Sequence, residues 1–84
     1  MTPQHMAIIF TEHALMKLKQ RRISRTLVER TLRKPQFVLR SRGRRKVAYR
    51  KFRRLYLKVV FVEERGHTVV ITQHWDEAFT LSRS

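Results

Sequence analysis

The first part of the chain carries hydrophobic residues at helical spacing. They recur at intervals of three and four residues, so they share one face of a predicted helix: Ala14, Leu15 and Leu18. Thr11 is a suitable N-cap, because its hydroxyl can accept a hydrogen bond from the first turn. The carboxylate of Glu12 suits the positive end of the helix dipole. The pattern predicts a helix over residues 12–21.

A second hydrophobic stripe follows after a tight connection. Ser24 offers another N-cap, and the stripe that follows it consists of Leu27, Val28, Thr31 and Leu32. Pro35 ends this segment, because proline has no backbone N–H and restricts the residue before it. We therefore expect a second amphipathic helix between Ser24 and Pro35.

The remaining residues favour strands. Strand-forming residues are concentrated in four segments, Phe37–Leu39, Val47–Phe52, Leu55–Glu63 and His67–Trp75. Turn signals separate them around Gly43, at Arg53-Arg54 and at Arg65-Gly66. The strongest of these strands alternates, with one face formed by Leu57, Val59 and Phe61. The short apolar segment Ala7–Phe10 fits an additional N-terminal strand.

This order of elements predicts a single α+β domain over residues 1–84. Two N-terminal helices are expected to pack on one face of an antiparallel meander sheet, and the other face is expected to be open.

The charge distribution adds a surface to this fold. The net charge is +14, and from Arg30 to Val62 there are thirteen cations and no carboxylate. Nine of these cations lie between Arg40 and Arg54, interrupted by apolar and aromatic residues. That spacing is typical of a folded hairpin and not of a disordered basic tail. The open face is therefore predicted to be basic, with a polyanion as its partner.

Composition excludes several classes of protein. The chain has no cysteine, which excludes a disulfide scaffold, a zinc finger and a thiol nucleophile. Its histidines show no metal-ligand spacing: His5, His13, His67 and His74. We expect no metal and no cofactor. The longest apolar run is too short to span a bilayer, and the N-terminus lacks the pattern of a signal peptide. A cytoplasmic protein is expected.

Three motifs in this order resemble a known family. They are Phe10-Thr11-Glu12-His13-Ala14-Leu15, then Arg21-Arg22-Ile23-Ser24, and finally Val69-Val70-Ile71-Thr72 in the last strand. With the helix closed by Pro35, they resemble an uncharacterised small-domain branch of the RelE/ParE toxin superfamily. In that pattern a glycine stands at the position of Arg22. A left-handed arginine there costs about 1 kcal/mol.

The resemblance implies a RelE-like toxin of a bacterial toxin–antitoxin system. Members of the superfamily are commonly messenger RNA endoribonucleases that inhibit growth, use no metal and often act on the ribosome. Others inhibit DNA gyrase. The implied partners are RNA and an acidic antitoxin protein. A non-catalytic RNA- or DNA-binding protein is the alternative that fits the same basic composition.

Metal-free RNA cleavage requires a base, an acid and cations beside the phosphorus. The candidate catalytic residues are His74, Lys46 and Arg50. Alternation places His74 opposite Val69 and Ile71, so it faces the open side if those two residues belong to the core. His13 matches a histidine of the family pattern, and we expect a structural role at the helix start, with catalysis as the alternative.

Further residues of the basic segment are candidate RNA contacts. Phosphate or base contacts are expected from Lys51, Arg53, Arg54, Arg44, Arg45 and Tyr49. The aromatic rings of Tyr49, Tyr56 and Trp75 either stack on bases or pack within the sheet.

Overall fold

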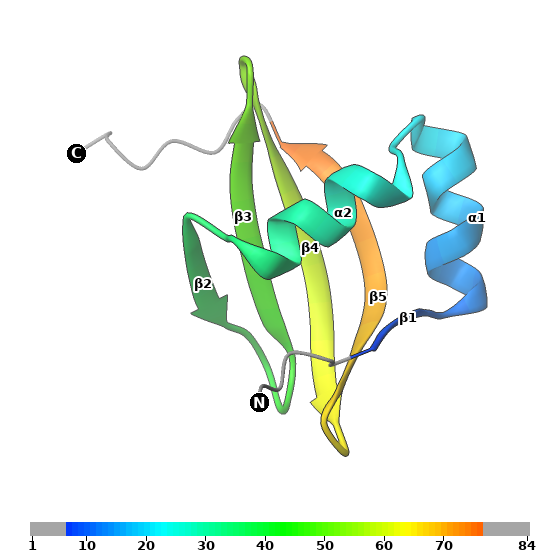
Figure 1. The fold of residues 1–84 in the computed structure, drawn as a ribbon, viewed down its shortest axis with the longest axis vertical. Coiled ribbons are helices and arrows are strands. Elements are labelled where there is room, and N and C mark those ends of the chain that lie inside the picture. The colour runs from blue at the N-terminus through cyan, green and yellow to red at the C-terminus, as the bar shows by residue number, and fades with distance from the viewer. Residues whose placement is uncertain (1–6, 77–84) are drawn as a thin grey trace.

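The computed structural model describes residues 7–76 and shows two helices and a five-stranded sheet (Figure 1). Its elements are, in chain order, β1 (Ile8–Phe10), α1 (Glu12–Arg21), α2 (Arg25–Arg33), β2 (Phe37–Arg40), β3 (Lys46–Phe52), β4 (Leu55–Glu64) and β5 (His67–Asp76). The predicted α+β class is confirmed.

Both helices begin at the predicted caps. The hydroxyl of Thr11 accepts a hydrogen bond of 3.0 Å from the backbone N–H of Ala14, and Ser24 does the same for Leu27 at 3.2 Å. These bonds satisfy N–H groups that have no partner within the helix. Among residues 7–76, no helix is long and apolar enough to cross a membrane.

The sheet has the strand order β1-β5-β4-β3-β2. Strands β2 to β5 form the antiparallel meander that the sequence predicts. The additional N-terminal strand is present at the edge, where it pairs with β5 in parallel, Ile8 opposite Thr68 and Phe10 opposite Val70. The complete sheet is therefore mixed.

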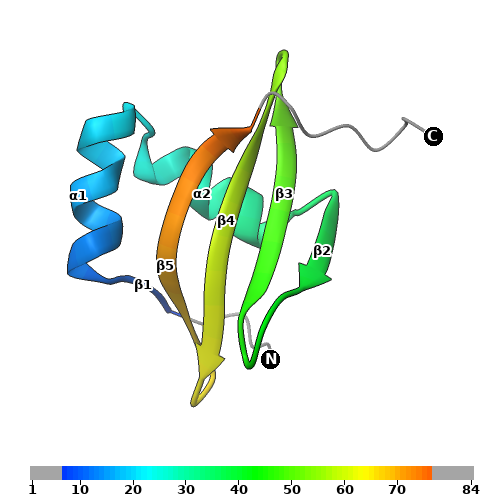
Figure 2. The ribbon, with the colours of Figure 1, turned by 180° about the vertical axis from the view of Figure 1, so that it is seen from behind.

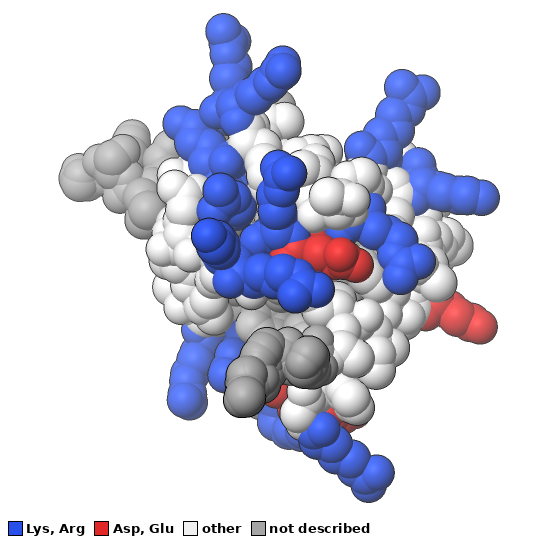
Figure 3. Space-filling model, in the orientation of Figure 1, with Lys and Arg blue, Asp and Glu red and all other residues white. Residues whose placement is uncertain are grey.

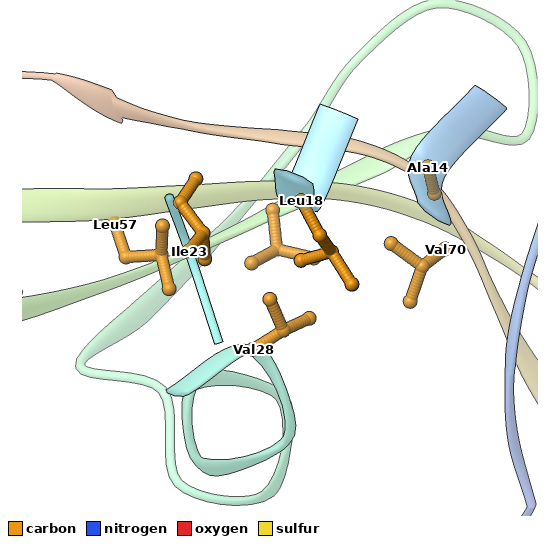
Figure 4. Packing of buried hydrophobic residues seen from close by; sticks show 7 residues of the cluster. Ala14, Leu18, Ile23, Val28, Leu57 and Val70 are labelled. Carbon is orange, nitrogen blue, oxygen red and sulfur yellow. The ribbon is translucent and has the colours of Figure 1, made fainter. Parts of the chain in front are cut away.

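The core lies between the helices and one face of the sheet. Figure 1 shows α2 crossing this face, and α1 lying beside β5 at the sheet's edge. Figure 4 shows the buried cluster, which is formed by Ala14, Leu18, Ile23, Val28, Leu57, Val59 and Val70. The fully buried Gln73 also faces the helices, because its Nε2 donates a 2.9 Å hydrogen bond to the carbonyl of Ala14. This bond ties α1 to β5.

A register shift in β5 decides which of its residues face the core. Phe61 pairs with Val70, but the preceding residue Val60 pairs with Thr72, so Ile71 is an extra residue in β5. Such a bulge reverses the simple alternation of side chains. Val70 before the bulge and Gln73 after it are both fully buried, so the condition that Val69 and Ile71 belong to the core is not met. His74 faces the helix-free side because of the bulge.

The connection between the helices is strained at one residue. Arg22 ends α1 with φ 53° and ψ 51°, a left-handed conformation, and its N–H bonds back to the carbonyls of Leu18 and Lys19. Glycine has no Cβ and adopts this conformation freely, whereas other L-residues adopt it at a cost. The backbone is therefore strained at Arg22, where the family pattern that the chain resembles has glycine.

We predict that Arg22→Gly stabilises the protein by about 1 kcal/mol, because it removes this strain. Urea unfolding measures the change. Lys19→Gly is the matched control, since it also removes one charge but lies within α1. It should destabilise the protein by about 1 kcal/mol. Equal effects of the two variants would contradict the assignment of strain to Arg22.

Candidate active site

The face of the sheet turned away from the helices carries a row of side chains across four strands. Residues directly opposite each other in antiparallel strands point to the same face. The register therefore aligns Phe37 of β2 with Tyr49 of β3, Tyr49 with Lys58 of β4, and Lys58 with His74 of β5. Figure 2 shows this face, with α2 behind the sheet. We call these four residues the cross-strand row.

A second row lies on the same face, two residues away along each strand. Lys51 is opposite Tyr56, and Tyr56 is opposite Asp76. The two rows lie two residues, or about 7 Å, apart along each strand, so long side chains of both rows can reach one bound group. Cationic, anionic and aromatic side chains thus meet on a face that none of the described helices covers.

His74 is the titratable centre of the cross-strand row. Partial burial lowers its pKa below the ordinary 6.5, and the positive charges of Lys58 and Arg21 lower the pKa further. The carboxylate of Asp76 acts in the opposite direction. The net direction is downward, so the imidazole is neutral at pH 7. A neutral imidazole can accept a proton, which a general base must do.

Arg21 reaches this site from the end of α1. Its Nη1 donates a 2.8 Å hydrogen bond to the carbonyl of Gln73, the residue before His74. Arg21 opens the motif Arg21-Arg22-Ile23-Ser24, whose sequence alone predicts only a connection between the two helices. The motif itself was the available signal, but contact with the last strand requires the three-dimensional fold.

The aromatic residues form one wall of the site. The ring of Phe37 stacks on Tyr49 at 5.0 Å between centroids, and lies 6.1 Å from the tilted ring of Tyr56. Burial, together with the charge of Asp76, raises the pKa of Tyr49 above 10.0. Tyr49 is only 6% exposed, so its ring packs in the sheet and is poorly placed to stack on a base.

The structure does not bring Lys46 and Arg50 together with His74. These two residues share a face with Ala48, which is 1% exposed and pairs with the core residue Val59. That face is the one covered by the helices, which corrects the expectation of a common catalytic group. Their side chains also have other partners. Lys46 Nζ lies 3.0 Å from a carboxylate oxygen of Glu63, and Arg50 Nη1 donates to the carbonyl of Lys34 at 2.8 Å.

The other predicted RNA contacts are spread over three regions. Lys51 lies on the helix-free face, whereas Arg53 and Arg54 occupy the β3–β4 turn. Arg44 and Arg45 lie at the opposite end of β3, where Arg44 Nη1 is 3.9 Å from Glu64 Oε2. The expected single basic face is therefore corrected to several separate basic regions.

The two remaining candidates lie elsewhere. His13 is exposed on the first turn of α1 and is not part of the sheet, and Trp75 faces the helices, where its ring meets Phe52 edge-on at 6.3 Å. Within residues 7–76, no three histidine or acidic side chains gather where a metal ion could be held. His5 lies outside the described residues.

Comparison with known protein families finds a match over most of the chain. Residues 10–72 match a family described as "Domain of unknown function (DUF4258)". The chain belongs to the DUF4258 family. The matched part of this DUF4258 domain includes Arg21, Tyr49 and Lys58, and it ends two residues before His74. Comparisons with curated proteins and with solved structures give no match.

We predict that the imidazole of His74 titrates with a pKa below 6.5. Lys58→Met should raise this pKa, because it removes a nearby positive charge, and Asp76→Asn should lower it. Proton NMR of the His74 ring across a pH series measures all three values. If neither substitution moves the midpoint, Lys58 and Asp76 do not share a site with His74.

Proposed function

We propose that this protein is a RelE-like toxin that cleaves messenger RNA without a metal ion. The observation that carries the proposal is the position of His74 directly opposite Lys58 on the helix-free face. The downward pKa shift of His74 leaves it able to act as a base near pH 7. The charge of Arg21 lies close enough to contribute to that shift.

The proposed reaction uses a hydroxyl group of the RNA itself. His74 accepts the proton of the 2′-hydroxyl, whose oxygen attacks the adjacent phosphorus. The bond from phosphorus to the 5′-oxygen breaks, and the ammonium of Lys58 donates a proton to that oxygen. Lys58 and Arg21 also stabilise the negative charge that develops on phosphorus. The products are a 2′,3′-cyclic phosphate and a 5′-hydroxyl end.

The arrangement of the motifs supports the RelE-like part of this proposal. The family resemblance rests on motifs at the two ends of the described chain. In the structure, Arg21 of the second motif donates a hydrogen bond to the carbonyl of Gln73, the residue directly after the last motif. Residues separated in sequence by more than half of the chain therefore contribute to one site. We further propose a cytoplasmic toxin, with the ribosome as a platform for cleavage and an acidic antitoxin protein as its inhibitor.

One observation favours a non-catalytic nucleic-acid-binding protein as the second candidate. Many arginines of the basic segment lie away from His74, at turns and on the helix-bearing side. Polyanion binding by itself requires such cations and no base. The two candidate functions differ in one respect: His74 and Lys58 are essential for the activity of a ribonuclease but not for nucleic-acid binding alone.

We predict that His74→Gln and Lys58→Met each lower RNA cleavage by at least about 100-fold, the usual effect of losing a general acid or base. Cleavage is measured by mapping new 5′-hydroxyl ends after inducible expression, together with growth arrest. Circular dichroism checks that the variants retain their fold. The unchanged protein should arrest growth and create new RNA ends.

Lys46→Met distinguishes the structural proposal from the sequence prediction. It removes the same charge as Lys58→Met, but from the opposite face of the sheet. The structure leads us to expect nearly unchanged cleavage, whereas a catalytic Lys46 would lead to a large loss. Growth arrest with intact RNA and damaged DNA would indicate a gyrase-directed toxin. RNA binding without growth arrest would favour the non-catalytic nucleic-acid-binding protein.

A further inference from the structure

The helix-bearing side of the molecule carries its own basic region. A shallow pocket beside α2 is lined by Arg30, Arg33, Lys34 and Arg50, together with Thr26 and Glu29. Figure 3 shows this side, with basic side chains gathered around a small acidic patch. Four cations against one carboxylate leave a net positive region. The cross-strand row lies on the other side of the sheet.

An apolar pocket adjoins this region at the β3–β4 turn. It has a volume of about 940 Å³ and is lined by Leu27, Phe52, Leu55 and Trp75, with Arg53 and Arg54 from the turn. The guanidinium of Arg50 lies 5.6 Å from the ring centroid of Phe52, so Arg50 connects the two pockets. A hollow with aromatic walls and surrounding arginines suits a nucleotide base and its phosphates.

Backbone strain at the turn points to a use for one of these arginines. Arg53 has φ 62°, and the other positive-φ residues besides glycine in the described chain are also arginines, Arg22 and Arg65. Glycine would occupy these positions without strain. Strained residues tend to persist at functional sites. Arg53 thus places a cation beside the apolar pocket from a backbone conformation that is costly for an arginine.

We propose that these two pockets form a second binding site, which holds a single-stranded RNA segment on the helix-bearing side. A base enters the pocket of Phe52 and Trp75, and the adjoining phosphates lie on Arg30, Arg33 and Lys34. The choice of RNA as the ligand rests on the proposed function. The cross-strand row and its neighbours carry few cations, and Asp76 opposes them. A long substrate therefore needs its backbone held elsewhere.

The geometry favours RNA over an acidic peptide. Arg30 and Arg33 are separated by nearly one helical turn, or about 5 Å along α2, and Lys34 follows at the C-cap. These cations can contact neighbouring phosphates of one backbone. The rings of Phe52 and Trp75 meet at 86°, which gives the pocket two flat walls. An acidic peptide is the competing occupant in the test.

The test compares Arg53→Gly with the control Arg65→Gly, both made in the full chain. The probe is a short 2′-O-methylated RNA, which cannot be cleaved through its 2′-oxygen, and fluorescence anisotropy measures its affinity. Arg53→Gly should weaken binding about tenfold. Its unfolding temperature should be equal or higher, because the substitution relieves strain. Arg33→Ala should lower the slope of log affinity against log salt by about 0.7.

Arg65→Gly is the matched control. It removes the same charge and relieves the same kind of strain (φ 50°), but in the β4–β5 turn at the other end of the sheet. Its effect on affinity should be much smaller than that of Arg53→Gly. Equal weakening by both variants, or no binding of the probe, would overturn the second site.

Two parallel measurements separate the remaining outcomes. An acidic peptide such as polyglutamate that binds in an Arg53-dependent way, while RNA does not, would also overturn the proposal. RNA cleavage by the unchanged protein is assayed separately. Its absence would count against the proposed function, and the comparison of Arg53→Gly with Arg65→Gly would still decide whether the second RNA site exists.

Discussion

The pairing of β4 with β5, including the bulge at Ile71, organises both the core and the candidate site. On one side of the bulge, β5 contributes Val70 to the core. Beyond it, Gln73 and Trp75 turn toward the helices, while His74 and Asp76 turn to the helix-free face. Without the extra residue, unbroken alternation from Val70 would direct His74 into the core. One local irregularity thus allows a single strand to anchor α1 and to place His74 on the helix-free face.

Local chemistry was sufficient to predict the elements. Thr11, Ser24 and Pro35 specify where the helices begin and end, because capping and proline restrictions act within a few residues. Strand boundaries follow from turn residues such as Gly43 and Gly66, which adopt positive φ. Even the strain at Arg22 was visible, since the resembling pattern has glycine there. These features need no knowledge of which elements meet in space.

The composition of the site could not be predicted in the same way. Alternation along β3 groups Lys46 with Arg50 and separates both from Lys51, but periodicity does not say which face the helices cover. Ala48, small and almost completely buried against β4, decides that question only in the folded chain. Lys58 was not selected because it interrupts a strongly apolar strand. Arg21 was not selected because its contact with Gln73 joins distant segments.

The folded chain separates the candidate site around His74 from much of its positive charge. On the helix-free face, Asp76 partly offsets the few cations, and partial burial is the largest influence on the pKa of His74. A dense cluster of arginines beside His74 would keep its pKa low, but it would also attract phosphate nonspecifically from every direction. Placing Arg30, Arg33 and Arg50 behind the sheet allows a polyanion to be held at one surface while the imidazole environment is set at another. The two surfaces share β3, whose successive residues Tyr49 and Arg50 point to opposite sides. If RNA binds on both sides as proposed, the strand must pass around an edge of the sheet, and the fold sets the length of RNA needed to do so.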